Sequence, residues 1–296
     1  MAAVSVKDKK KTINVSSSRL PVYIGPITGW IVIFVFVPLG VVLYFSFLRA
    51  GLFGEIINIF TFENYKTAFQ IKYAQIFLRS FQLACEANIL CILIGYPLAY
   101  WIARYGGRWK TRLMSLVIRP SWTCYLIRLY AFKTIVGRTG LLNSFLLSIK
   151  LISAPLEILF TPTAVLIGLV YTWLPFMILP LYASLEGLNP RLLEAAEDLG
   201  ATPFQTFIKV TLPLTKGGLI AGSILVFIPS LGDWLVPHVL GGRRVLMAGS
   251  LVAYHFMEVG NIPVGASLAV SLSTIVILAL YILIKVGGKG ALERIV

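Results

Sequence analysis

Charged residues are scarce in this chain of 296 amino acids. Only 13% of its residues are charged, whereas about a quarter are charged in a typical soluble domain. Hydrophobic residues make up 58% of the chain, and the mean hydropathy is +0.86. This shortage of charge, with long apolar runs, excludes an ordinary soluble protein and indicates an integral membrane protein.

Cysteine and histidine are also rare, and their positions argue against several kinds of site. Cys85, Cys91 and Cys124 lie in apolar runs without the spacing of metal ligands, so we expect thiols buried in the core. His238 and His255 have no neighbours for a metal site or a nucleophilic triad. The sequence therefore predicts no metal centre and disfavours an intramembrane enzyme.

Acidic residues are the scarcest charged class: 12 Asp and Glu stand against 26 Lys and Arg, for a net charge of +14. The basic residues lie in short loops and near the N-terminus rather than on one compact domain, so we expect no nucleic-acid partner. The chain also lacks a glycine-rich phosphate-binding motif. We expect no cofactor on this chain, and any ATP site would belong to another one.

Six apolar segments have about 20 residues or more, the length needed to cross the hydrocarbon layer. They cover residues 27–48, 76–103, 113–135, 163–185, 219–240 and 264–286. The first is too long for the core of a signal peptide and has no cleavage site after it, so it is read as an uncleaved span. The predicted fold is an all-α integral membrane bundle of six transmembrane helices. Prolines within the spans indicate kinks, and they are Pro38, Pro97, Pro120, Pro175, Pro180, Pro229 and Pro237.

The distribution of lysine and arginine predicts the orientation of the bundle. These residues are concentrated in the tail 1–19, in 104–112, in 187–218 and near the C-terminus. The side of the membrane that is richer in them is normally cytoplasmic, so both termini are expected in the cytoplasm. Residues 1–19 are expected to be a basic tail and residues 20–296 the membrane domain. The segment 49–75 then faces outward, as an amphipathic element too polar to span.

A polar block of helix-forming residues separates the fourth and fifth spans. Pro190 suits the first turn of a helix that carries Glu194, and Gly200 suits its end. Pro203 starts a second helix, which we expect Pro213 to end. The result is a helical elbow with a small, acidic tip. It is either a connector lying on the lipid surface or a docking element for a soluble partner.

The residues of this elbow resemble the "EAA" loop of bacterial ABC importer permeases. The matching positions are Glu194, Ala195, Ala196, Gly200, Leu212 and Pro213. The resemblance implies a type I ABC importer permease fold, with 187–218 as the cytoplasmic coupling loop. In that family the short helix of the loop docks into a groove on the ATPase subunit and transmits its power stroke.

A wider resemblance, over about residues 25–286, is closest to the first permease subunit of putrescine/spermidine importers. It implies a second homologous permease, two copies of a cytoplasmic ATPase and a periplasmic polyamine-binding protein as partners, in the bacterial inner membrane. Arg119, Cys124 and Tyr125 depart from the expected pattern. The matching segments are 120–123, 127–131, 213–223, 227–229 and 240–242.

Ionisable residues inside spans are functional candidates, because each is costly unless it faces protein or water. Asp233 beside Trp234 suits a polyamine, since the carboxylate attracts an ammonium group and the ring offers a cation–π contact; the alternative is a structural ion pair. Glu86 either lies on the substrate path or forms a salt bridge with Arg79. Glu186 is either a gate or a group at a helix end.

Two arginines and several aromatic residues complete the candidates. Arg128 is expected to form an internal pair that holds the bundle together, and Arg119 is expected to extend toward the membrane surface. Trp122 and Tyr130 are candidates for an aromatic wall of the substrate path, against a packing or interface role. For Tyr125, Tyr171 and Trp173, packing is the expectation.

Four functional classes follow in order of support. The first is a permease subunit of an ATP-driven polyamine importer that works by alternating access. The second is the same machine for another small solute, and the third is a stand-alone secondary transporter or channel. The last is an intramembrane enzyme, for which the sequence lacks the necessary residues.

Overall fold

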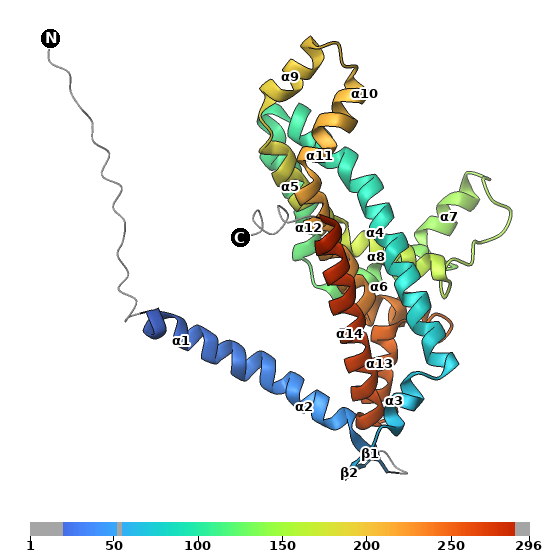
Figure 1. Ribbon diagram of the computed structural model, residues 1–296. Helices are drawn as coiled ribbons and strands as arrows, with labels where there is room; N and C mark the ends of the chain where they lie inside the picture. The colour runs from blue at the N-terminus through green and yellow to red at the C-terminus, as the bar shows by residue number, and fades with distance from the viewer. Residues whose placement is uncertain (1–19, 52–54, 288–296) are drawn as a thin grey trace.

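The computed structural model describes residues 20–51 and 55–287 (Figure 1). The predicted basic tail, 1–19, lies outside these residues. Four helical segments of the described chain are long and apolar enough to cross a membrane, and a bent pair provides a fifth. The four are Gly25–Ser46, Ile71–Tyr105, Pro162–Glu186 and Ile262–Ile282, and the pair, bent by 65°, is Pro203–Leu214 with Lys216–Gly232.

The described chain is almost entirely helical. Its α-helices are α1 (Leu20–Ile31), α2 (Val37–Ser46), α3 (Glu63–Ala68), α4 (Ile71–Tyr105), α5 (Lys110–Ile118), α6 (Tyr125–Val136), α7 (Leu141–Ser148), α8 (Pro162–Glu186), α9 (Pro190–Asp198), α10 (Pro203–Thr206), α11 (Leu212–Leu214), α12 (Lys216–Gly232), α13 (Ala248–Met257) and α14 (Ile262–Gly287). Short 3₁₀ or π turns are η1 (Val32–Phe36), η2 (Gly107–Trp109), η3 (Arg119–Trp122), η4 (Phe207–Thr211) and η5 (Pro237–Gly241), and the strands are β1 (Leu48–Ala50) and β2 (Ile56–Phe60).

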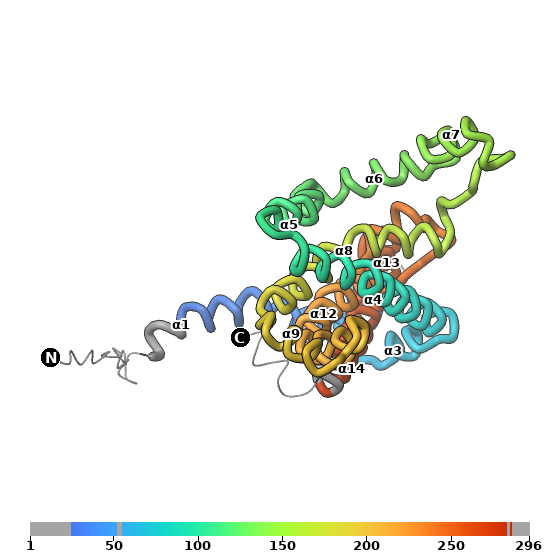
Figure 2. The backbone as a smooth tube through the Cα atoms, turned by 90° about the horizontal axis from the view of Figure 1, so that it is seen from above, coloured from blue at the N-terminus to red at the C-terminus, as the bar shows by residue number. Residues whose placement is uncertain are grey.

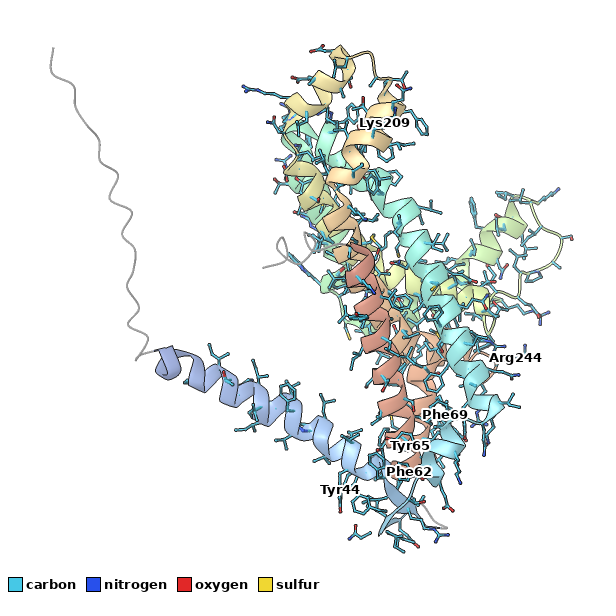
Figure 3. The ribbon with its side chains drawn as sticks, viewed as in Figure 1. Tyr44, Phe62, Tyr65, Phe69, Lys209 and Arg244 are labelled. Carbon is cyan, nitrogen blue, oxygen red and sulfur yellow. The ribbon has the colours of Figure 1, made fainter. Side chains whose placement is uncertain are left out.

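The long helices α4, α8 and α12 pack together and form the centre of the bundle. Figure 3 distinguishes its two ends: Lys209 lies at the end formed by α9 and α10, whereas Phe62 and Tyr65 lie at the end near the strands. Helices α5, α6 and α7 follow one another along one side of the molecule (Figure 2).

Glycine lets α12 approach α8 closely. A Cβ atom added at Gly218 would lie 2.5 Å from the Cβ of Ser184 and 2.6 Å from the carbonyl oxygen of Pro180. Both separations are shorter than van der Waals contact, so a side chain here would push the two helices apart. Small residues at helix contacts are a general feature of membrane bundles for this reason.

Gly218→Ala is therefore expected to lower the stability of the bundle by roughly 1–3 kcal/mol, the usual cost of overpacking. The melting temperature of the protein in detergent would measure the effect. Fluorescence-detected size-exclusion chromatography after heating provides this temperature. Gly40→Ala is the matched control, because nothing lies within 4 Å of a Cβ atom at Gly40. Equal melting temperatures for the two variants would contradict close packing at Gly218.

The first predicted span is helical but makes little contact with the rest of the chain. The segment α1–η1–α2 projects away from the bundle (Figure 1), and none of its most apolar window is buried. Trp30 is 65% exposed and Phe36 61%. Only the end of the segment near the strands is anchored, where α2 packs against α14.

The third predicted span, 113–135, is wrong as a single helix. Helix α5 ends at Ile118, and after the turn η3 the backbone is extended at Thr123 and Cys124 (ψ 152° and 125°) before α6 begins. Pro120 contributes to the break because it has no N–H to donate. The break also explains why Cys124 is exposed and not in the core; Cys91 is buried and Cys85 half-buried.

The fifth predicted span, 219–240, is also interrupted. Helix α12 ends at Gly232, and Asp233 has an extended backbone (ψ 126°). The chain then forms the π turn η5, and α13 follows as a separate helix. The described residues thus contain four or five helices long and apolar enough to span, and the prediction of six spans stays a prediction, because hydropathy does not reveal where a helix breaks.

The all-α prediction misses a small β-hairpin in the segment 49–75. Strands β1 and β2 pair antiparallel, with Leu48 opposite Phe60. The β-branched and aromatic residues of 56–60 favour a strand. The buried side chain of Asn64 supports the hairpin by donating to the carbonyl oxygens of Ser46 (3.0 Å) and Leu48 (2.7 Å).

Candidate functional site

Helix α9, which carries the EAA-like residues, begins and ends as predicted. The side chain of Asn189 accepts a hydrogen bond from the amide of Arg191 (3.1 Å) and caps the helix that starts at Pro190. Gly200 follows with φ +83°, a left-handed conformation that suits glycine. Its amide donates to the carbonyl oxygen of Glu197 (2.9 Å), which closes the end of the helix.

The second half of the elbow extends further than predicted. Thr202 and Gln205 form a reciprocal capping box at the start of α10. The helix then continues past Pro213 to Leu214, so the prediction that Pro213 ends it is wrong. The wider turn η4 accommodates the proline: the amide of Leu212 donates to the carbonyl five residues back. Pro213 itself is exposed, and Leu212 is half-buried.

One side of the elbow is anchored to the bundle. Leu193 of α9 is buried. Phe207 packs edge-on against Tyr96 and Tyr100 of α4, with ring centres 5.4 and 5.8 Å apart. The hydroxyl of Tyr96 is also 2.7 Å from that of Thr215, at the bend before α12. The elbow is therefore packed against α4 and joined to the start of α12.

The other side of the elbow is open to solvent. Glu194, Glu197 and Asp198 are exposed, and none of them forms an ion pair with any residue that the structure describes. Leu199 is 89% exposed and Phe204 71%. An exposed acidic surface bordered by large apolar side chains is suited to a protein partner. Of the two alanines, Ala195 is exposed and Ala196 half-buried.

Asp233 is buried at the break after α12, and its carboxylate accepts three hydrogen bonds. Oδ1 accepts hydrogen bonds from the amides of Leu235 (2.9 Å) and Val236 (3.1 Å). Oδ2 accepts one from the hydroxyl of Tyr125 in α6 (2.5 Å). In the described chain no lysine or arginine pairs with it, so the alternative of a structural ion pair is wrong. The carboxylate instead joins the break in α12 to the start of α6.

Several polar groups of α8 and α12 have incomplete hydrogen bonding. Thr172 and Trp173 of α8 lie next to Tyr125 and Asp233, yet Thr172 Oγ1 and Trp173 Nε1 form no hydrogen bond of normal geometry. Ser230 Oγ, three residues before Asp233 in the chain, is buried and has no hydrogen-bond partner in the part of the chain that the structure describes. Such groups are costly in an apolar interior, so they indicate a place for water or for a polar ligand.

Arg128 lies beside the ring of Tyr125 without a carboxylate partner. Its Nη1 donates to the carbonyl oxygen of Pro120 (2.7 Å). The guanidinium carbon is 5.7 Å from the ring centre of Tyr125 and 5.6 Å from that of Tyr171. The predicted internal contact is present, but its partners are two rings and a carbonyl rather than an acid.

The other candidates of the substrate path are dispersed. Trp122 is 81% exposed, Tyr130 50% and Trp234 42%. Within the described residues, Trp122 and Tyr130 make no hydrogen bond or ring contact with Asp233. Tyr130 instead lies under the amine of Lys133, at 5.6 Å from the ring centre.

The two candidate glutamates have local partners. Glu86 accepts a hydrogen bond from Gln82 (2.8 Å) and forms no pair with Arg79, because seven residues along a helix separate them by about 10 Å. Glu186 lies 3.6 Å from Lys110 in a partly exposed ion pair at the α9 end of the bundle. Glu186 is the last residue of α8, and its role as a gate or as a helix-end group stays a prediction.

Sequence reasoning named Tyr125 as a departure from the family pattern and as an aromatic residue for which packing is the expectation, but not as the partner of Asp233. It did not name Thr172. No local pattern marks Thr172, because its position beside Tyr125 comes from packing between helices distant in sequence.

Comparison with known proteins identifies the family. Residues 95–286 match the family described as "Binding-protein-dependent transport system inner membrane component". The chain belongs to this family. Over 92% of its length it is 41% identical to the spermidine/putrescine transport system permease protein PotB of Haemophilus influenzae, of which it covers 94%. Its identity with the protein of the same name in Escherichia coli K12 is 40%, over 86% of the chain and 93% of that protein.

More distant relatives support the fold. The permease is 29% identical to the molybdenum transport system permease protein ModB of Mycobacterium bovis, over 72% of the chain and 77% of that protein. A bacterial ABC transporter that imports alginate superposes with a TM-score of 0.70 at 15% identity, over 91% of this chain and 96% of that one. The MetNI methionine transporter superposes with a TM-score of 0.52 at 16% identity, over 74% and 94%. The fold is that of an ABC importer permease, and the protein is a transport subunit rather than an enzyme.

Proposed function

We propose that this permease moves polyamines, putrescine or spermidine, into the cytoplasm as part of an ATP-driven importer. The observation that carries the proposal is the identity of about 40%, over most of the chain, with permeases of spermidine/putrescine systems. The buried carboxylate of Asp233, with aromatic rings nearby, is chemically suited to an amine.

The proposed topology has six passes through the bacterial inner membrane, with both termini in the cytoplasm. The third pass is the broken segment α5–η3–α6, and the fifth is α12 with the bend before it. Loops rich in lysine and arginine at the α9 end support a cytoplasmic position for the elbow. The β-hairpin end then faces the periplasm.

The proposed partners follow from the surfaces left open. The exposed apolar segment α1–η1–α2 requires lipid or a second homologous permease to cover it, and pairing with that permease would bury it. The exposed elbow receives an ATPase subunit, one per permease. A periplasmic polyamine-binding protein delivers substrate at the hairpin end, consistent with the solved alginate transporter in complex with a "periplasmic protein".

The proposed mechanism is alternating access driven through the elbow. Closure of the ATPases draws the two elbows together, and the contacts of Phe207 and Tyr96 carry the movement to α4 and α12. The cavity opens outward and accepts substrate, and ATP hydrolysis then resets it toward the cytoplasm. Glu194 with its neighbouring alanines forms the docking surface in this scheme.

Uptake by the complete transporter in proteoliposomes tests the proposal. We expect ATP-dependent accumulation of labelled spermidine or putrescine, inhibited by the other polyamine and unaffected by molybdate or sugars. Accumulation of molybdate without polyamine inhibition would favour another solute, a possibility kept open by the molybdenum relative. Uptake without any ATPase would favour a stand-alone transporter instead.

A further inference from the structure

Arg128 is half-buried, and no carboxylate among the described residues pairs with it. Arginines within membrane proteins commonly pair with carboxylates or face water. The guanidinium group here lies between the rings of Tyr125 and Tyr171, with one hydrogen bond to the carbonyl oxygen of Pro120. Its Nε is buried and has no hydrogen-bond partner. Among the residues that the structure describes, the guanidinium is therefore in contact with neutral groups and with no acid.

Asp233 does not neutralise this charge directly. Its oxygens are already engaged by two amides and by the hydroxyl of Tyr125. The hydroxyl is thereby turned toward the carboxylate, and the face of the same ring remains available to a cation. Asp233 thus acts as a positioning residue for the ring of Tyr125.

Two aromatic faces and a carbonyl oxygen form a binding site for an organic cation. Aromatic cages of this kind bind ammonium groups, and an ammonium also needs hydrogen-bond acceptors. The hydroxyl of Thr172, on the neighbouring helix α8, lies beside Tyr125 and forms no hydrogen bond of normal geometry.

We propose that Arg128 occupies the binding site of the substrate's ammonium group, formed by the rings of Tyr125 and Tyr171 and the carbonyl oxygen of Pro120. The amine must displace the arginine to bind there. This inference rests on the proposed function, because it assumes a polyamine as cargo. While Arg128 occupies this site, its positive charge repels a second cation, so small cations do not bind there. An amine presented at high local concentration exchanges with the arginine, whose weak contacts permit release.

The competing interpretation is that Arg128 is a permanent structural cation. A structural arginine normally has its donors satisfied and its charge paired, as the bidentate geometry of the guanidinium allows. Neither condition holds for Arg128 among the described residues. The two interpretations predict opposite effects when the charge is removed.

Binding of labelled spermidine to the nucleotide-free complex in nanodiscs, without binding protein, distinguishes them. If Arg128 competes with the amine, the Arg128→Gln complex should bind spermidine roughly tenfold more tightly than the natural complex. The reason is that a like charge is removed from the binding site. Arg128→Lys keeps the competing charge and should remain close to the natural affinity. Unchanged or weaker binding by a folded Arg128→Gln complex would overturn the proposal.

Arg138→Gln is the matched control for the loss of a positive charge. Arg138 is exposed and paired with Glu157 at 3.6 Å in the loop region beyond α6, so its removal should not change spermidine affinity. Equal tightening in this variant would point to a general electrostatic effect and would also overturn the proposal. If the natural complex transports no polyamine at all, the proposed function itself fails.

A second pair of variants keeps the proposal testable should Arg128→Gln not fold. Tyr171→Phe retains the aromatic face, and Tyr171→Leu removes it. We expect the KM for spermidine uptake to rise roughly fivefold in Tyr171→Leu and to stay unchanged in Tyr171→Phe, because the cation–π contact needs only the ring. An unchanged KM in Tyr171→Leu would show that the ring does not bind the amine.

Discussion

Replacement of Glu194 by lysine is expected to reduce ATP-driven uptake more than tenfold while the permease still folds. Glu194 is exposed on α9 and has no ion-pair partner among the residues described, so its charge contributes little to the bundle. At a docking surface, by contrast, reversal of a charge places like charges together and costs several kcal/mol. The variant should therefore be expressed normally, but ATP hydrolysis by the partner should no longer drive uptake efficiently.

Two measurements separate coupling from folding in this experiment. Uptake in proteoliposomes reports transport, and copurification of the ATPase with the permease reports docking. Glu157→Lys is the control, because Glu157 is an exposed glutamate whose ion pair with Arg138 is at the surface. If Glu194→Lys retained both uptake and the bound ATPase, α9 would be an ordinary surface connector and the coupling role would be refuted.

Substitution of Asp233 is expected to give the second large effect. The replacement decides whether the stability of the protein or its KM for substrate changes. Asp233→Leu leaves the hydroxyl of Tyr125 and the amides of Leu235 and Val236 without an acceptor. Each unsatisfied buried donor costs about 1–3 kcal/mol, so the variant should lose several kcal/mol of stability or fail to fold. The melting temperature of the purified protein would measure this loss.

Asp233→Asn separates the structural role of this residue from its charge. The amide oxygen of asparagine still caps the amides, so the protein should fold. Its neutral side chain no longer attracts a cation, so we expect the KM for spermidine to rise roughly tenfold, equivalent to about 1.4 kcal/mol. Transport with natural kinetics by a folded Asp233→Asn protein would mean that Asp233 acts only as a cap.

The elbow shows why local structure could be predicted from the sequence. Its first helix begins at Pro190, which needs no hydrogen-bond donor there, and ends before Gly200, which adopts positive φ at little cost. Each preference depends on the backbone of a few consecutive residues. Such preferences operate in almost any tertiary context, and the prediction therefore agrees with the structure.

The broken helices could not be predicted from local sequence preferences. Hydropathy averages over about 20 residues and reports only that a segment is apolar. At the second interruption, after α12, the amides of Leu235 and Val236 donate to the carboxylate of Asp233. That carboxylate in turn accepts a hydrogen bond from Tyr125, which is 108 residues away in the chain. Neither composition nor periodicity contains this information.

Composition and turn chemistry alone determined that this is a membrane protein of apolar helices with a polar, helical elbow. The large cost of exposing apolar runs to water and the backbone preferences of proline and glycine act locally, so a sequence expresses them directly. The tertiary structure alone decided that Asp233 caps a broken helix and that Arg128 lies between two tyrosine rings. Those contacts join α6, α8 and α12, and only the packing of the three helices brings their side chains within reach of one another.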